Sequence, residues 1–230
     1  MQKSSNNTTA KYPWLKYTLT WNPRKSTISD MALYISQIAF QTVLAYLSVF
    51  LLGPLSYSGI SLFYFVYPFM LVFTMWWGFW GALGSYVGTV IGSGLLAGLG
   101  LVPALLDGFA DLIPALLVFI VYRGIMAKYG YDPLWRDLVF KVVDGVKAKR
   151  ASAWMWFILF NGVAFNLVAT EIAMSVFFGF GLIPPAAYWF WWVGFFLSDL
   201  IPTVLIAPIL ISGLSSILTR QNLITLGWLS

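Results

Sequence analysis

Long apolar stretches, nearly free of charge, are the feature that most constrains this sequence. They cover residues 31–52, 58–77, 79–98, 102–122, 152–179 and 187–212. About 20 apolar residues are enough to cross the hydrocarbon core of a bilayer as one helix. A helix also satisfies its own backbone hydrogen bonds, as lipid requires. The sequence therefore predicts an all-α integral membrane protein, a bundle of about six transmembrane helices.

The composition agrees with a membrane location and excludes several kinds of chemistry. Only 9% of the residues are charged and 60% are hydrophobic, whereas a soluble domain carries about 25% charged residues. The sequence has no cysteine and no histidine, which removes thiol nucleophiles, disulfides and the commonest zinc and haem ligands. We therefore expect a protein that is not an enzyme, with no cofactor, no metal and no nucleic-acid partner.

The basic residues predict the orientation of the helices. Of thirteen Lys and Arg, five precede the first apolar stretch, seven lie between the fourth and fifth, and Arg220 follows the sixth. An even number of crossings separates these three groups, so the positive-inside rule places all of them in the cytoplasm. We expect a multi-pass protein of the cell membrane with a cytoplasmic N-terminal segment 1–30, a transmembrane domain 31–220 containing a cytoplasmic loop 123–150, and a cytoplasmic tail 221–230.

Four acidic residues fall within or near the predicted spans, with no Lys or Arg at comparable depth. They are Asp107, Asp111, Glu171 and Asp199. An ionisable side chain in the middle of a membrane costs roughly 2.5–3.5 kcal/mol to insert, so such residues usually face a cavity or a partner. As a group they indicate a solute-binding site.

Two of these acids occur in closely similar segments, Ala-Asp-Leu-Ile-Pro at 110–114 and Ser-Asp-Leu-Ile-Pro at 198–202. Each proline frees a backbone carbonyl one turn earlier, which bends the helix or offers an oxygen to a partner. A purely structural role, in which each Asp only stabilises its proline kink, is the alternative. The same predicted site includes polar and aromatic residues of the fifth and sixth helices: Asn161, Asn166, Trp189 and Trp192.

Small residues recur along the third predicted helix, where Gly84, Gly88 and Gly92 are spaced by four. Such a stripe lets a second helix approach closely. The second helix could belong to the same bundle or to a partner protein.

The stretch from Leu62 to Arg123 resembles the substrate-binding S-components of energy-coupling-factor vitamin transporters. The likeness is carried by the sequence Met-Trp-Trp-Gly-Phe-Trp-Gly-Ala at 75–82, the Gly-rich helix after it, and a helix that closes with Tyr122 and Arg123. This resemblance implies a solute pocket that opens outward, a membrane-embedded T-component as partner, and two cytoplasmic ATPases. The residues that match the family's docking alanines most closely are Ala32 and Ser36.

These observations favour a solute-binding subunit of a micronutrient uptake transporter. The carboxylates favour a small cationic solute, or protons, over an anion. A noncatalytic structural subunit of a larger membrane complex is the second hypothesis. A Mg²⁺-dependent lipid transferase is the third, because Asp107 and Asp111 are spaced like a pair of metal-binding aspartates.

Overall fold

The computed structural model describes residues 28–50, 63–121, 150–221, 223 and 224, and every regular element in this part is a helix. The predicted basic segment 1–30 lies almost wholly outside the described residues. So do most of the loop 123–150 and of the tail 221–230.

The helices follow the predicted apolar stretches closely. They are α2 (Ile28–Phe50), α3 (Val66–Thr89) with the π-helical turn η3 (Val90–Leu95), α4 (Leu101–Asp107), α5 (Phe109–Val118), α6 (Arg150–Phe157), the π-helical segment η7 (Ile158–Ala164), α7 (Phe165–Gly179), the short η8 (Pro185–Ala187) and α8 (Tyr188–Arg220). Five stretches of the described residues are long and apolar enough to cross a membrane, as in a multi-pass membrane protein. One of these five, Val66–Leu95, is broken at Gly78.

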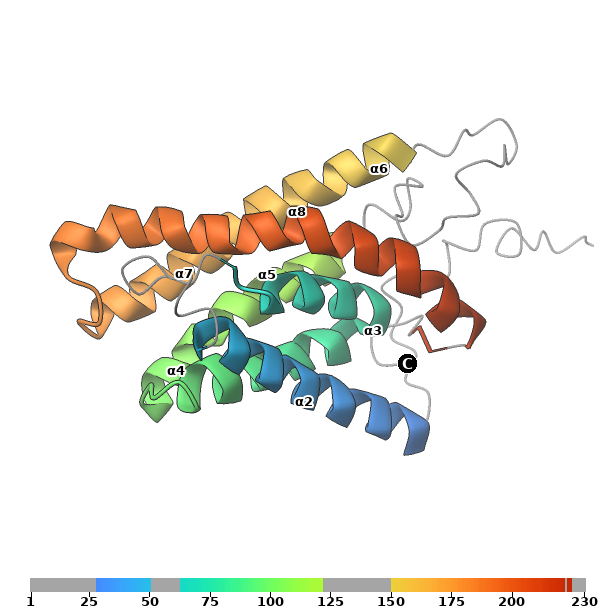
Figure 1. Cartoon of the computed structure of the whole chain (residues 1–230), viewed down its shortest axis with the longest axis horizontal. Helices are drawn as coiled ribbons and strands as arrows, with labels where there is room; N and C mark the ends of the chain where they lie inside the picture. The colour runs from blue at the N-terminus through green and yellow to red at the C-terminus, as the bar shows by residue number, and fades with distance from the viewer. Residues whose placement is uncertain (1–27, 51–62, 122–149, 222, 225–230) are drawn as a thin grey trace, which may run out of the picture.

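The chain reverses direction at Gly78, whose φ of 59° and ψ of −132° lie outside the helical region. Glycine adopts a positive φ without the clash that a Cβ would cause. A continuous helix would separate Phe73 and Gly81 by about 12 Å, yet a Cβ placed on Gly81 would collide with the carbonyl of Phe73. Tyr64 and Ser93, at matching distances from the turn, are hydrogen-bonded to each other. α3 is therefore a hairpin of two antiparallel arms, visible in Figure 1.

The glycine stripe of the second arm packs against α2. A Cβ placed on Gly84 would lie 2.9 Å from the Gln37 side chain, and one on Gly88 would lie 2.5 Å from Cβ of Gln41. The absence of side chains brings the two backbones close enough for Gln37 Nε2 to donate to the carbonyl oxygen of Gly81 over 2.7 Å. Interhelical hydrogen bonds of this kind contribute about 1 kcal/mol in membranes.

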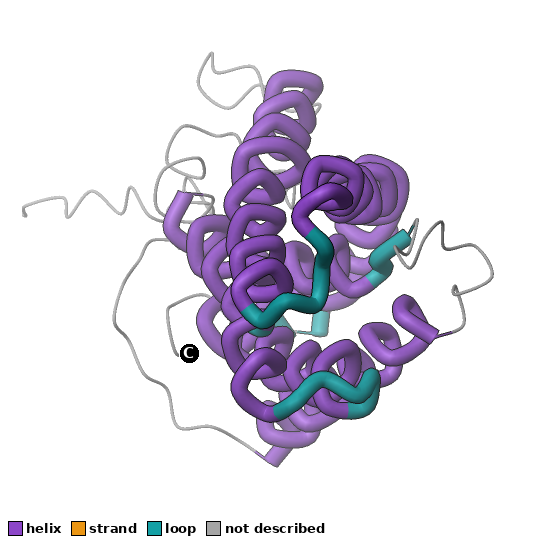
Figure 2. The backbone as a smooth tube through the Cα atoms, turned by 90° about the vertical axis from the view of Figure 1, so that its left-hand side faces the viewer, coloured by secondary structure: helices purple, strands orange, loops and turns teal. Residues whose placement is uncertain are grey.

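Three distant parts of the chain meet at one end of the bundle. The ring of Tyr34, near the start of α2, stacks on Trp80 at 5.5 Å. The indole of Trp77 donates to the carbonyl of Leu223, beyond the end of α8, over 3.0 Å. The start of α2, the turn at Gly78 and the end of α8 therefore lie together, at the right of Figure 1. Figure 2 views the bundle from the opposite end.

A dense hydrophobic core fills the half of the bundle that contains the turn at Gly78. Trp76 is 2% exposed and its indole donates to Ser215 Oγ of α8 over 2.9 Å. The core draws on the first arm of α3, α5, α6 and α8, and its members include Met70, Leu71, Met75, Val118, Phe157 and Ile211. Because this core occupies one half of the bundle, the other half is left for a cavity.

Replacing Gly88 by Ala should destabilise the protein by about 1–3 kcal/mol, the usual effect of overpacking. The added methyl group would meet Cβ of Gln41, which cannot move without displacing α2. Thermal unfolding of the purified protein in detergent measures the change. The matched control is Gly213→Ala on α8, where no neighbouring atom lies within 4 Å. Equal melting temperatures for both variants would contradict the close packing.

Candidate ligand-binding cavity

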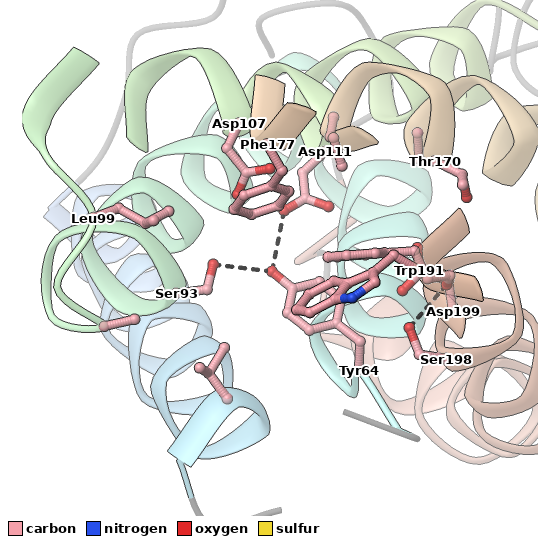
Figure 3. A pocket seen from close by; sticks show the side chains of 16 residues that line it. Tyr64, Ser93, Leu99, Asp107, Asp111, Thr170, Phe177, Trp191, Ser198 and Asp199 are labelled. Carbon is pink, nitrogen blue, oxygen red and sulfur yellow. Dashed lines mark hydrogen bonds between the residues drawn. The ribbon is translucent and has the colours of Figure 1, made fainter. Parts of the chain in front are cut away.

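A cavity of about 370 Å³ lies between the end of α2, the residues just before α3, η3, the α4–α5 segment, α7 and α8 (Figure 3). It sits in the half of the bundle away from the Gly78 turn. Its volume falls near the lower end of the range of about 300–1,000 Å³ that is typical of ligand pockets. The lining residues are Val49, Tyr64, Ser93, Ala97, Leu99, Asp107, Ala110, Asp111, Ala169, Thr170, Ala173, Phe177, Trp191, Phe195, Ser198 and Asp199.

Two carboxylates reach the cavity from the junction of α4 and α5. Asp107 ends α4 and Asp111 lies in the first turn of α5, so the four-residue spacing directs both side chains to one face. Gly108 between them packs against Tyr86 and Val90, and a Cβ there would lie 2.6 Å from Val90 Cγ2. The missing side chain lets α4 and α5 lie close to the second arm of α3.

Tyr64 crosses the cavity and joins its walls. Its hydroxyl donates to Asp111 Oδ2 over 3.4 Å and lies 3.3 Å from Ser93 Oγ. Figure 3 shows both interactions as dashed lines. Asp111 is only 5% exposed, and its hydrogen-bonding groups include this hydroxyl and that of Thr89. The carboxylate thereby keeps a fixed direction toward the cavity.

The backbone of Tyr64 is held by a carbonyl that a proline has freed. Pro202 has no N–H and cannot donate to Ser198, four residues before it. The amide of Tyr64 donates to this Ser198 carbonyl instead, over 2.9 Å. The next amide, that of Phe65, donates to Ser48 Oγ at the end of α2 over 3.2 Å. The start of α3 is thus fixed to both α8 and α2.

The opposite wall carries the third carboxylate, Asp199 of α8, which is 7% exposed. Thr170 of α7 and Ser198 add hydroxyl groups to this side of the cavity. Aromatic rings complete it, because Phe177 stacks on Phe195 with centroids 5.5 Å apart. The indole of Trp191 lies beside Phe195 as well, at 6.1 Å.

The cavity has an acidic and aromatic character. Three of its lining residues are aspartates, four are aromatic, and none is Lys or Arg. Within the part of the chain that the structure describes, no three acidic side chains converge in a way that would hold a metal ion. The arrangement suits an organic ligand that presents positive charge and an apolar body, because carboxylates attract the charge and ring faces attract cations.

The predicted site residues divide into two groups. Asp107, Asp111 and Asp199 line the cavity. Asn166 does not line it: its amide donates to the carbonyl of Phe196 over 2.8 Å and so ties α7 to α8. Asn161 is also buried and outside the lining, and its side-chain oxygen has no hydrogen-bond partner among the described residues.

Glu171, Trp189 and Trp192 lie away from the cavity. Glu171 is exposed and accepts a 2.9 Å hydrogen bond from the indole of Trp192, while Trp189 is 73% exposed. The reason is geometric, since each residue advances about 100° around a helix. Glu171 is two residues from both Ala169 and Ala173, which line the cavity, so it points about 160° away from them.

The glycines predicted as partner contacts, Gly84, Gly88 and Gly92, face α2 within the bundle. Packing inside the bundle was one of the two interpretations of this stripe, and the structure has that arrangement. Ala32 and Ser36 lie on the outward face of α2, where both are exposed.

Several lining residues were not singled out by the sequence, and two helical stripes could have revealed them. Trp191, Phe195 and Ser198 follow one another at spacings of four and three, which keeps them on one face of α8. Thr170, Ala173 and Phe177 form the matching stripe on α7. Tyr64 and Ser93 had no such signal, because they meet only after the reversal at Gly78.

Comparison with known proteins gives no further guide: no protein-family model, curated protein or solved structure matches this chain.

Tyr64→Phe should lower the free energy of unfolding by about 1–3 kcal/mol, because it removes one of the two hydroxyl donors of the buried Asp111, Tyr64 and Thr89. The measurement is thermal or denaturant unfolding in detergent. Tyr86→Phe is the control. It removes the same hydroxyl group, but the hydrogen bond that this hydroxyl donates to the carbonyl of Leu105 is exposed. A Tyr64 variant as stable as the Tyr86 variant would show that the bridge contributes little.

Proposed function

We propose that this chain is the membrane-embedded, solute-binding subunit of an uptake transporter, and that the cavity is its solute site. The observation that carries the proposal is the composition of the cavity wall: three aspartates and four aromatic rings, with no basic side chain among the lining residues. Ionisable side chains at membrane depth are usually functional. An enclosed acidic cavity of this size is suited to a small cationic solute.

A six-helix arrangement with both termini in the cytoplasm supports this proposal. The two arms that meet at Gly78 would be separate crossings, which adds one crossing to the five apolar stretches. The ends of α2, α6 and α8 that adjoin the three basic groups in the sequence then lie on the side of the Gly78 turn. The cavity lies in the other half, and its lining residues Ala97 and Leu99 are close to the connection between η3 and α4. It would therefore open to the outside, where an uptake protein meets its solute.

Energy for uptake would come from partner proteins. The sequence contains no Gly-Lys-Ser/Thr phosphate-binding loop, and the resemblance to S-components implies a T-component and cytoplasmic ATPases. The exposed face of α2 that carries Ala32 and Ser36 is the surface we propose for the T-component. Micronutrients of the vitamin type are the corresponding solute class.

The topology is testable because the chain has no cysteine. Leu96→Cys and Leu182→Cys, at exposed sites beside two connections, should react with a membrane-impermeant maleimide on intact cells. Gln221→Cys should react only after the cells are permeabilised. Phe50→Cys, at the exposed end of α2, should be labelled from the same side as Leu96→Cys, because the two arms of α3 lie between them. Labelling of Phe50→Cys and Leu96→Cys from opposite sides would contradict the hairpin at Gly78 as a pair of crossings.

Solute binding is expected to change the fluorescence of Trp191. The purified protein would be titrated with a panel of small amines, alcohols and carboxylates, and only amines should give a saturable signal. Trp191→Phe should remove most of this signal, whereas Trp189→Phe, outside the cavity, should retain it. Asp111→Asn and Asp199→Asn should each weaken binding of the tightest-binding amine by about tenfold or more, the effect of about 1.4 kcal/mol.

Glu171→Gln is the matched control for these charge substitutions. It removes a carboxylate on a neighbouring helix that does not line the cavity, so binding should be unchanged. Equal affinity of the wild type, Asp111→Asn and Asp199→Asn for every amine that binds would refute the assignment of the site. A panel in which no solute of any charge binds would refute the proposed function itself.

A further inference from the structure

The three carboxylates of the cavity come from two of its walls. Asp107 and Asp111 come from the α4–α5 junction, and Asp199 comes from α8. No three acidic groups among the described residues converge on a common point, as they would around a metal ion. In Figure 3 the first two lie near each other, while Asp199 lies apart from them, past the ring of Trp191.

Each wall also has hydroxyl groups of its own. Beside Asp111 is the hydroxyl of Tyr64, which also contacts Ser93, and beside Asp199 is the hydroxyl of Ser198. Three residues after Tyr64, the hydroxyl of Tyr67 is fully buried and has no hydrogen-bond partner among the described residues. An ammonium group has three donors and needs several oxygen acceptors. Both walls supply a carboxylate with such acceptors next to it.

The space between the walls is aromatic and apolar. Phe177 and Phe195 form a stacked pair, with Trp191 beside them, and Ala169 and Ala173 provide a smooth apolar surface. A single ammonium ion that is hydrogen-bonded at one wall would leave the carboxylate of the other wall without a bonded cation. Burying an uncompensated charge is costly, so the complementary ligand carries positive charge at both of its ends.

Resting on the proposed function, we infer that the solute is an extended organic dication, with two amino groups or equivalent cationic groups joined by an apolar or aromatic segment. One cationic end binds Asp111 and Asp107, and the other binds Asp199. The connecting segment lies against Trp191 and Phe177. A monovalent cation of the same shape is therefore expected to bind more weakly than the dication.

Matched pairs of amines test the inference with the purified full-length protein. The probes are α,ω-diaminoalkanes from diaminobutane to diaminooctane, each against the 1-aminoalkane of equal length, and para-xylylenediamine against para-methylbenzylamine. At least one diamine should bind about tenfold or more tightly than its monoamine partner, because it adds one buried charge pair. Asp199→Asn should reduce that diamine to the affinity of the monoamine and leave the monoamine within about twofold of its wild-type value.

A second variant keeps the test decisive if Asp199→Asn does not fold. Asp199→Glu retains the charge and moves the carboxylate into the cavity by one methylene, so the preferred diamine should become shorter. Equal affinities within every pair, or no binding by any amine, overturn the inference. The two failures are distinguishable: saturable binding of monoamines or of other solutes leaves the proposed function intact, whereas a protein that binds no solute of any class loses both.

Discussion

Lipid offers no hydrogen-bond partner, so every backbone group that leaves a helix at membrane depth must find one inside the protein. This constraint explains the position of Tyr64. Pro202 interrupts the helical hydrogen bonds of α8 and leaves the carbonyl of Ser198 free, and the amide of Tyr64 bonds to it. The same residue then directs its hydroxyl to Asp111 on the far wall. The carbonyl that Pro202 leaves free in α8 thus holds the start of α3 beside the cavity.

Close packing on one side of the bundle and open space on the other have a common origin in residue size. Glycines of the second arm of α3 let α2 approach to backbone distance, and Gln37 bonds across this contact. Around the Gly78 turn, large residues such as Trp76 and Met75 fill the interior completely. Farther along the bundle the inward positions of α7 are small, with Ala169 and Ala173. The cavity exists because these alanines face the aspartates and no large side chain fills the gap.

Hydrophobic length was enough to predict the helical class and the break between residues 77 and 79, and most helix bounds were predicted to within a few residues. The start of α3 and the end of α8 were each misplaced by eight residues. Side-chain direction was harder to predict. The acids of the two similar Asp-Leu-Ile-Pro segments line the cavity, as predicted. Their prediction needed only the pattern within each segment and its depth in the membrane. Glu171 was grouped with them by depth, but its direction around α7 puts it on the outer surface. Tyr64 escaped prediction because its role depends on contacts between residues far apart in the chain.

The two Asp-Leu-Ile-Pro segments show how a repeated local pattern can build a two-sided site. Both aspartates lie about 15 Å along helices that start at the same end of the bundle, which gives them similar depth. They come from α5 and α8, two helices that each pack against the hairpin formed by α3, so equal depth alone does not bring them together. Tyr64 contacts both segments, through its hydroxyl on Asp111 and its amide on Ser198. The separation of the two carboxylates is therefore set by the protein backbone, and a ligand that bridges them must match a length that the fold has fixed in advance.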